Sequence, residues 1–407
     1  MGSQFFATLL SIVIAISSAA GAQSFEELER LLDEHPSLTA LAYQQEAARE
    51  RSIAASALPD PQVSFGVNNL PVSDPAFNRF LPTNKAIGVR QELPNLAGRR
   101  ARRAQAEAAA SLTAAMRAAR YDALKAELVA LLHEKARIKV ARQAAEAQRT
   151  AYAELAEIID GEIRGGRPSV YRLAEIDAEQ AEVASNLAAL SAQEAEADAR
   201  LIDLLGFVPD TPAPSVAIFP WQDDPASFHA VALAAADIAH SESSVAEARA
   251  AFRPNWGAQV TYQQREEGSG AAGAQFAGDD WVSGMVTVSV PLWAGKSQKP
   301  KLRAAKAEEA AARSHYLAAV RSARAQYAAF SAQHRTAIEQ QAILTEKVSA
   351  IEDEIASQLR LYESGRGTYA PVLEGEIAIL TLRARIARQK ASAATAAARM
   401  NSLLVSP

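Results

Sequence analysis

The 407-residue sequence contains no cysteine, which excludes disulfide bonds, thiolate metal sites, thiol catalysis and a lipid anchor on an N-terminal cysteine. Aromatic residues make up only 6% of the chain, a content that suits closely packed helices better than a bulky globular core. Basic residues number 42 and acidic residues 47, so the net charge is −5. This balance lacks the positive excess of a nucleic-acid-binding protein, and we expect no nucleic-acid partner.

The sequence has one long apolar run, at its N-terminus. Phe5 to Ile16 has the length of the apolar region of a signal peptide and is too short to span a membrane as a helix. Small residues at Ala20 and Ala22 predict cleavage before Gln23, so residues 1–22 are interpreted as a signal peptide; the alternative is a buried N-terminal helix. No later run approaches the ~20 apolar residues of a transmembrane helix. Export would then lead to the periplasm, to the exterior or to a β-barrel in a membrane.

Proline and glycine are both absent from two long stretches, Arg99 to Asp160 and Lys301 to Ser364. Because these residues are the main breakers of helices, each stretch predicts one continuous helix about 90–100 Å long. A shorter uninterrupted segment follows each of them, Ser169 to Leu205 and Glu376 to Ser406. The pattern therefore predicts two helical hairpins, at about 99–206 and 296–406.

The two halves of the chain share further features. Each shorter segment is entered through a glycine turn, at Gly161 to Gly166 and at Gly365 to Gly367. A P-x-x-A-G-basic motif precedes each long helix, with Gly98 or Gly295 as its glycine. We predict a duplicated unit of about 200 residues, since chance similarity of two alanine-rich segments leaves this shared pattern unexplained. The predicted parts are a first repeat at 23–207, a linker at 208–224 and a second repeat at 225–407.

Two short segments with apolar residues at every second position precede each long helix, and each pair predicts a β-hairpin, at about 61–93 and 255–291. The alternating apolar residues are Val63, Phe65, Val67, Ile87, Val89, Trp256, Ala258, Val260, Tyr262, Val282, Val286, Val288 and Val290. Strands of about 8–11 residues with one apolar face are what a transmembrane barrel requires; a small soluble β-subdomain is the alternative. Because the smallest barrels have about eight strands, four strands that span a membrane would need further copies of the chain.

The ordered combination of these features resembles the TolC-type outer-membrane efflux family. The shared elements are the twofold helix, hairpin, long helix and returning helix, the P-x-x-A-G-basic junctions, and the Gly-x7-Leu turns at Gly165 and Gly365. Leu58 to Gln62 and Asn69 to Pro71, which flank the first strand, are similar to the heavy-metal branch in particular. The resemblance implies a mainly α fold with transmembrane β: a long α-helical periplasmic barrel, and four strands per chain completing a trimeric 12-stranded outer-membrane β-barrel.

What the resemblance implies for function is a passive exit duct for heavy-metal cations in the outer membrane of a Gram-negative bacterium, extending into the periplasm. Its partners would be two further copies of the chain, outer-membrane lipid, a periplasmic adaptor and an inner-membrane transporter of the resistance-nodulation-division type. The alternatives are a duct for drugs or for type I secretion, and a periplasmic coiled-coil scaffold without a pore. The six histidines show no ligand spacing and no catalytic motif is present, so we expect no enzyme, no cofactor and no permanent metal site.

The turn after the second long helix is similar to the family segment that closes the periplasmic end of the channel. The resemblance makes Tyr362 and Arg366 candidates for a latch between helices, and Glu374 a candidate for a ring of carboxylates that would favour cations. Pro371 replaces a second acidic residue, and Tyr171 stands where an acidic latch partner is expected. The alternative is that Tyr362 only packs and Glu374 is a solvated carboxylate.

Overall fold

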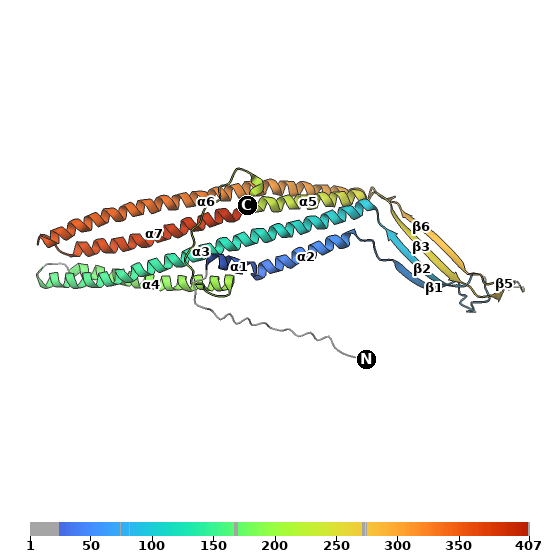
Figure 1. Cartoon of the computed structure of the whole chain (residues 1–407), viewed down its shortest axis with the longest axis horizontal. Helices are drawn as coiled ribbons and strands as arrows, with labels where there is room; N and C mark the ends of the chain where they lie inside the picture. The colour runs from blue at the N-terminus through green and yellow to red at the C-terminus, as the bar shows by residue number, and fades with distance from the viewer. Residues whose placement is uncertain are drawn as a thin grey trace, which may run out of the picture. The chain divides into compact units, whose positions relative to one another are not determined.

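The computed structural model describes residues 24–73, 75–80, 82–166, 170–270, 273 and 275–405; the predicted signal peptide lies outside these ranges. Its α-helices are α1 (Phe25–Asp33), α2 (Pro36–Ser56), α3 (Leu96–Arg164), α4 (Val170–Leu205), α5 (His229–Ala250), α6 (Gln298–Glu363) and α7 (Ala370–Leu403) (Figure 1). A short 3-10 helix, η1 (Pro225–Ser227), precedes α5. The strands are β1 (Gln62–Asn68), β2 (Asn84–Leu93), β3 (Asn255–Gln264), β4 (Gly268–Ser269), β5 (Gln275–Phe276) and β6 (Trp281–Ser289).

The four predicted long segments are helical, with two differences at their ends. Gly161 lies inside α3, so the first turn begins at Gly165 and the prediction that it starts at Gly161 is wrong. Helix α7 begins at Ala370 instead of Glu376. Pro371 is compatible with this earlier start because a proline in the first turn of a helix removes no intrahelical hydrogen bond.

Gly375 lies in the interior of α7, where glycine is unusual, and close packing against α6 accounts for it. A β-carbon at this position would lie 2.6 Å from Cγ1 and 3.0 Å from Cδ1 of Ile355. A side chain at this position would force Ile355 to shift, so the glycine allows the two helices of the second hairpin to approach each other.

We expect Gly375→Val to destabilise the second hairpin by about 1–3 kcal/mol, because the added methyl groups overpack the contact with Ile355. The matched control is Gly161→Val, since a β-carbon at this helical glycine meets nothing within 4 Å. Thermal unfolding followed by helical circular dichroism measures both. Equal midpoints for the two variants would show that the approach of Ile355 places no constraint on position 375.

The strands form one antiparallel sheet in the order β1-β2-β3-β6, and both predicted hairpins are confirmed. The pairing of β2 with β3 joins the hairpins, so Ile87 lies between Phe65 on one side and Tyr262 on the other. The alternating apolar residues of all four strands therefore share one face. Strands β4 and β5 form a separate two-stranded ribbon in the loop between β3 and β6, which the sequence pattern did not predict.

The described chain divides into two compact units that cut across the predicted repeats. One unit contains the residues up to Asp33, Leu128–Ser215 and Ile343–Ala391, and the other contains Glu34–Glu127, Val216–Ala342 and the residues from Ser392 onward. Each unit thus combines residues from both predicted repeats, whose boundaries stay a prediction.

The first unit is helical, and its core lies between α3, α4 and α7. Leu155 and Ile159 of α3 pack with Ile176 of α4 and with Leu373 and Ile377 of α7. Ion pairs between α3 and α4 join Lys135 to Asp198 at 2.8 Å and Arg142 to Glu194 at 3.0 Å. The hydroxyl of Tyr152 donates to Glu179 at 3.1 Å; burial, and then this carboxylate, raise the pKa of Tyr152 to about 12.

The second unit contains the sheet together with α2, α5 and the parts of α3 and α6 that adjoin it, up to Glu127 in α3 and up to Ala342 in α6 (Figure 1). Its described buried cluster surrounds Phe228, whose ring lies 5.1 Å from that of Trp221 and 6.1 Å from that of Tyr327. Within the described ranges, none of the helices combines the length and hydrophobicity that crossing a bilayer as a helix would require.

Candidate functional site: an exposed sheet face and two helical turns

One face of the sheet is apolar and exposed. Opposed residues on neighbouring strands point to the same side, so the register Phe65–Ile87–Tyr262–Val282 forms one continuous apolar row. Phe65 is 77% and Val282 is 72% exposed. We call this surface the apolar face; it consists of Val63, Phe65, Val67, Ile87, Val89, Leu93, Trp256, Ala258, Val260, Tyr262, Val282, Val286 and Val288.

The opposite side of the sheet, here the polar face, is hydrophilic. Ser64, Gly88, Thr261 and Ser283 form one of its rows. Soluble monomers rarely expose a continuous apolar surface of the extent of the apolar face. The apolar face therefore requires an apolar environment, and the polar face requires water.

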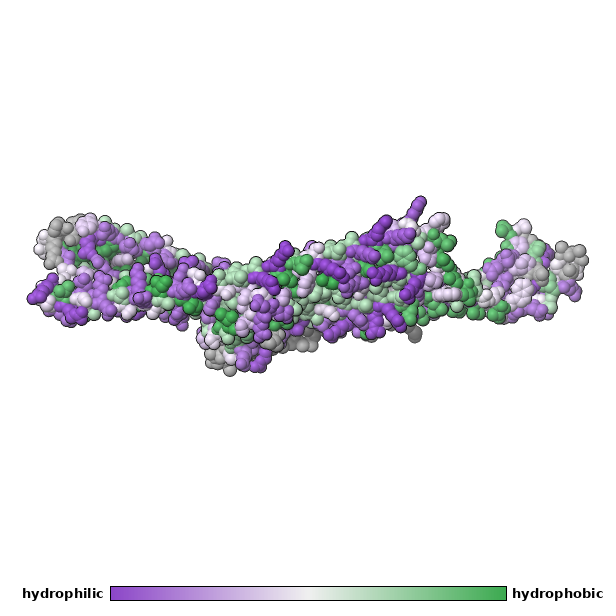
Figure 2. Space-filling model, turned by 90° about the horizontal axis from the view of Figure 1, so that it is seen from above, coloured by the Kyte–Doolittle hydropathy of each residue, from purple (hydrophilic) through white to green (hydrophobic). Residues whose placement is uncertain are grey.

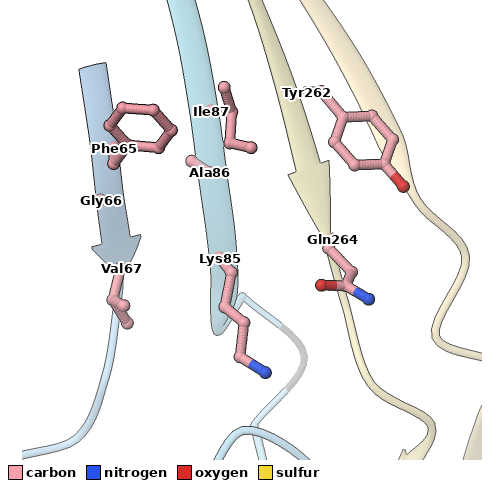
Figure 3. A pocket seen from close by; sticks show the side chains of 8 residues that line it. All are labelled: Phe65, Gly66, Val67, Lys85, Ala86, Ile87, Tyr262 and Gln264. Carbon is pink, nitrogen blue, oxygen red and sulfur yellow. The ribbon is translucent and has the colours of Figure 1, made fainter.

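A groove on the apolar face marks one end of the apolar band. Its volume is about 430 Å³, and the side chains of Phe65, Ile87 and Tyr262 lie across three strands beside it, with Lys85 nearer the loops (Figure 3). Lys85 is the one residue with a charged side chain among the strand positions of this face, and it forms an ion pair with Glu266 at 2.8 Å. From Lys85 to Leu93 the strand β2 rises about 27 Å, close to the height of about 25 Å of the apolar band of outer-membrane barrels.

The edges of the sheet are open. Within the described residues β1 pairs only with β2, and β6 pairs only with β3. Each outer strand therefore presents unpaired backbone N–H and C=O groups, which in lipid must be satisfied by another strand.

The two helical turns contain the glycines that the sequence singled out. Gly365 has a φ of +71°, a backbone conformation that other residues rarely adopt, which accounts for a glycine there. In the first turn the corresponding residue is Gly166, with a φ of +89°, whereas Gly165 has no positive φ. The left-handed position is thus one residue later than the sequence match of Gly165 with Gly365 implied.

The junction glycines differ in their surroundings. The backbone N–H of Gly98 donates to Oδ1 of Asn95 at 2.7 Å, so Asn95 caps the start of α3. Gly98 is buried, while a β-carbon on Gly295 would meet nothing within 4 Å. The counterpart of Asn95 in the second motif is Leu292, which has no capping oxygen, and α6 starts only at Gln298 after a series of turns.

The structure pairs Glu374 with a residue that the sequence reasoning missed. Nη2 of Arg172, near the start of α4, donates to Oε1 of Glu374, near the start of α7. The side chain of Glu374 is 47% exposed and that of Arg172 is 28% exposed. The available signal was positional, since Arg172 and Glu374 directly flank the matching leucines Leu173 and Leu373.

The two candidate latch residues lie at the second turn, Tyr362 in the last turn of α6 and Arg366 in the connection to α7. The ring of Tyr362 lies 5.3 Å from that of Tyr369, at an angle of 59°. Both rings line a groove of about 590 Å³ that includes Glu162 and Gly165 from the first turn. The backbone N–H of Arg366 donates to the carbonyl oxygen of Leu361 at 2.9 Å. Within the described residues the side chain of Arg366 forms no ion pair.

Two histidines have structural roles. Nε2 of His229 lies 2.7 Å from Oδ2 of Asp122, and Nε2 of His133 lies 2.9 Å from the carbonyl oxygen of Pro214. Burial lowers the pKa of His133. The described residues contain no group of three or more histidine, aspartate or glutamate side chains that could hold a metal ion.

Comparison with known proteins gives a match to a family model over part of the chain. Residues 226–405 match the family model described as outer membrane efflux protein. No curated protein matches the chain significantly.

Solved structures of channel and outer membrane proteins share the fold at low sequence identity. CusC is 14% identical with a TM-score of 0.76, over 94% of this chain and 92% of CusC. VceC from Vibrio cholerae is 16% identical with a TM-score of 0.74, over 93% of this chain and 95% of VceC. The open state of the MtrE channel from Neisseria gonorrhoeae is 17% identical with a TM-score of 0.77, over 93% of this chain and 88% of MtrE. The predicted class, a long helical barrel combined with barrel strands, is confirmed; the trimer stays a prediction.

Proposed function

We propose that this chain is an outer membrane efflux channel of the TolC-like type and serves as the passive exit duct of a tripartite pump for heavy-metal cations. Proteins of this type are channels and not enzymes, and they lie in the outer membrane of Gram-negative bacteria and extend into the periplasm. The observation that carries the proposal is the apolar face of the sheet. It is exposed on every strand, and it matches the height of a membrane band.

The open edges of the sheet support a homotrimer. The four strands of one chain are too few to close, and three copies would supply 12 strands if β6 of each copy paired with β1 of the next. In such a barrel the apolar face is directed toward lipid and the polar face lines the lumen. The long helices of the three copies would continue below it as the periplasmic tunnel.

The heavy-metal assignment is supported by the residues that flank β1, which are similar to the heavy-metal branch of the family. The duct would receive its cargo from an inner-membrane transporter of the resistance-nodulation-division type through a periplasmic adaptor. The turns between α3 and α4 and between α6 and α7 form the end that would face these partners, with Tyr362, Arg366 and Glu374 as gate residues. Glu374 would act there together with Arg172.

Planar-bilayer recording tests the duct. The purified full chain is expected to give discrete single-channel conductance steps and to migrate as a trimer in unheated gels. A protein that remains in aqueous solution without detergent and produces no conductance would identify the periplasmic scaffold instead.

Growth assays test the cargo. Deletion of the gene in its own host is expected to lower the tolerated concentration of heavy-metal salts and to leave drug tolerance unchanged. Restoring the gene should restore metal tolerance. Loss of drug tolerance with normal metal tolerance would overturn the heavy-metal assignment and leave the channel assignment intact.

A further inference from the structure

Positive charge is concentrated where the two long helices leave the sheet. Residues 93–106 contain four arginines and no acidic residue, and residues 281–307 contain four lysines, one arginine and no acidic residue. The chain as a whole has a net charge of −5, so this concentration runs against its overall composition. We call these residues the basic collar: Arg99, Arg100, Arg102, Arg103, Lys296, Lys299, Lys301, Arg303 and Lys306.

Most side chains of the basic collar are exposed and have no charged partner. Arg99 is half-buried and bonds to the carbonyl oxygen of Ser56, while Arg102 and Arg103 lie 3.9 and 2.8 Å from Glu247 and Glu107. In the described part of the chain no carboxylate lies within ion-pair distance of the others, which are Arg100, Lys296, Lys299, Lys301, Arg303 and Lys306. Six unpaired cations on two short segments repel one another, and an anionic partner would relieve this repulsion.

The basic collar adjoins the most exposed apolar residues of the junction. Leu292 is 78%, Trp293 is 79% and Leu96 is 55% exposed. Hydrophobic residues gather where the sheet meets the helices, next to projecting hydrophilic side chains (Figure 2). An exposed tryptophan beside cations is typical of the interface between the hydrocarbon layer and the lipid headgroups.

The spacing along α6 fits headgroups at this level. Lys301 and Arg303 lie three and five residues after the first residue of the helix, which corresponds to roughly 5–8 Å along its axis. Long basic side chains can extend toward a membrane interface from such positions. The surface potential of an anionic leaflet decays over about 8–10 Å, so the cations of the basic collar nearest the sheet, including Lys301 and Arg303, would lie within its range.

We infer that the basic collar binds the phosphate headgroups of anionic phospholipids in the leaflet that faces the periplasm. The inference rests on the proposed lipid-facing role of the apolar face, because that role brings the collar to the membrane surface. A phospholipid satisfies both features of the junction, since its chains cover Leu292 and Trp293 and its phosphate pairs with the cations. A nucleic acid or a soluble anion would leave the apolar residues uncovered.

Quenching of Trp293 by brominated lipids tests the inference. The full mature chain is reconstituted in phosphatidylcholine vesicles that contain phosphatidylglycerol, with bromine on the acyl chains of one lipid or of the other. The difference between wild type and Trp293→Phe isolates the signal of Trp293. Because one cation at an anionic surface corresponds to roughly a fivefold preference, we expect phosphatidylglycerol to be enriched about threefold or more around Trp293. High salt should reduce this enrichment.

Two charge-matched variants decide where the enrichment originates. Replacing Lys296, Lys299, Lys301 and Arg303 by glutamine removes four of the six unpaired cations and should bring the ratio close to one. Replacing four exposed cations of α7, Arg383, Arg385, Arg388 and Lys390, removes the same charge in the other compact unit and should leave the ratio unchanged. All eight side chains are exposed, so both variants should fold.

A ratio of one in wild type, or an unchanged ratio in the collar variant, would overturn the inference. Equal quenching by both brominated lipids would leave the proposed channel intact, because Trp293 would still lie at the membrane. Absence of quenching by either lipid would overturn the proposed membrane location together with the collar.

Discussion

Replacing Ile87 and Val89 by lysine is expected to keep the protein out of the outer membrane. Both side chains lie on the apolar face of β2, a strand that is paired on both sides, and they are 49% and 47% exposed. A lysine directed toward lipid near the bilayer midplane costs about 2–4 kcal/mol, and two of them per chain approach the stability of a whole domain. Fractionation of the two membranes, with unheated gels to detect trimer, measures the loss.

The control for this experiment is a pair of lysines on the polar face. Gln263→Lys and Thr287→Lys add the same charge at positions that the register places on the opposite side of the sheet. In the proposed barrel they face water, so we expect normal assembly. Normal assembly of the Ile87→Lys, Val89→Lys variant would show that the apolar face is not the lipid-facing one.

Local features of the sequence predict most of the fold. The continuous absence of proline and glycine over Arg99 to Asp160 and Lys301 to Ser364 indicates two long helices, and α3 and α6 cover these stretches almost completely. Each strand is indicated by apolar residues at every second position. Both kinds of signal are contained in neighbouring residues, which explains why the four long helices and both hairpins could be predicted.

What could not be predicted depends on residues far apart in the chain. Arg172 and Glu374 are separated by 202 positions, and the pairing of β2 with β3 joins two different hairpins. The interior position of Gly375 depends on the approach of Ile355 from another helix. The late start of α6 has a local cause, because Leu292 stands where Asn95 caps α3. The sequence analysis missed it because the P-x-x-A-G-basic motif leaves that position unspecified.

The ion pair of Arg172 with Glu374 determines how removal of either charge should change the ion selectivity of the proposed pore. While the two are paired, their charges largely cancel, so Glu374 alone does not supply a free ring of carboxylates. Glu374→Gln would leave the Arg172 cation unpaired and is expected to lower the ratio of cation to anion permeability. Arg172→Gln would leave the carboxylate unpaired and is expected to raise it. Reversal potentials in asymmetric potassium chloride measure both shifts.

The stability of the protein should change little in these variants, because partly exposed ion pairs contribute about 0–1 kcal/mol. Glu376→Gln is the matched control, since Glu376 is exposed but lies two residues further along α7 and therefore on another side of the helix. The double variant Arg172→Glu, Glu374→Arg restores the pair with reversed order and should return the reversal potential to that of wild type. Shifts of the same sign for Arg172→Gln and Glu374→Gln would contradict charge cancellation, and an unchanged reversal potential in Glu374→Gln would place that carboxylate outside the ion path.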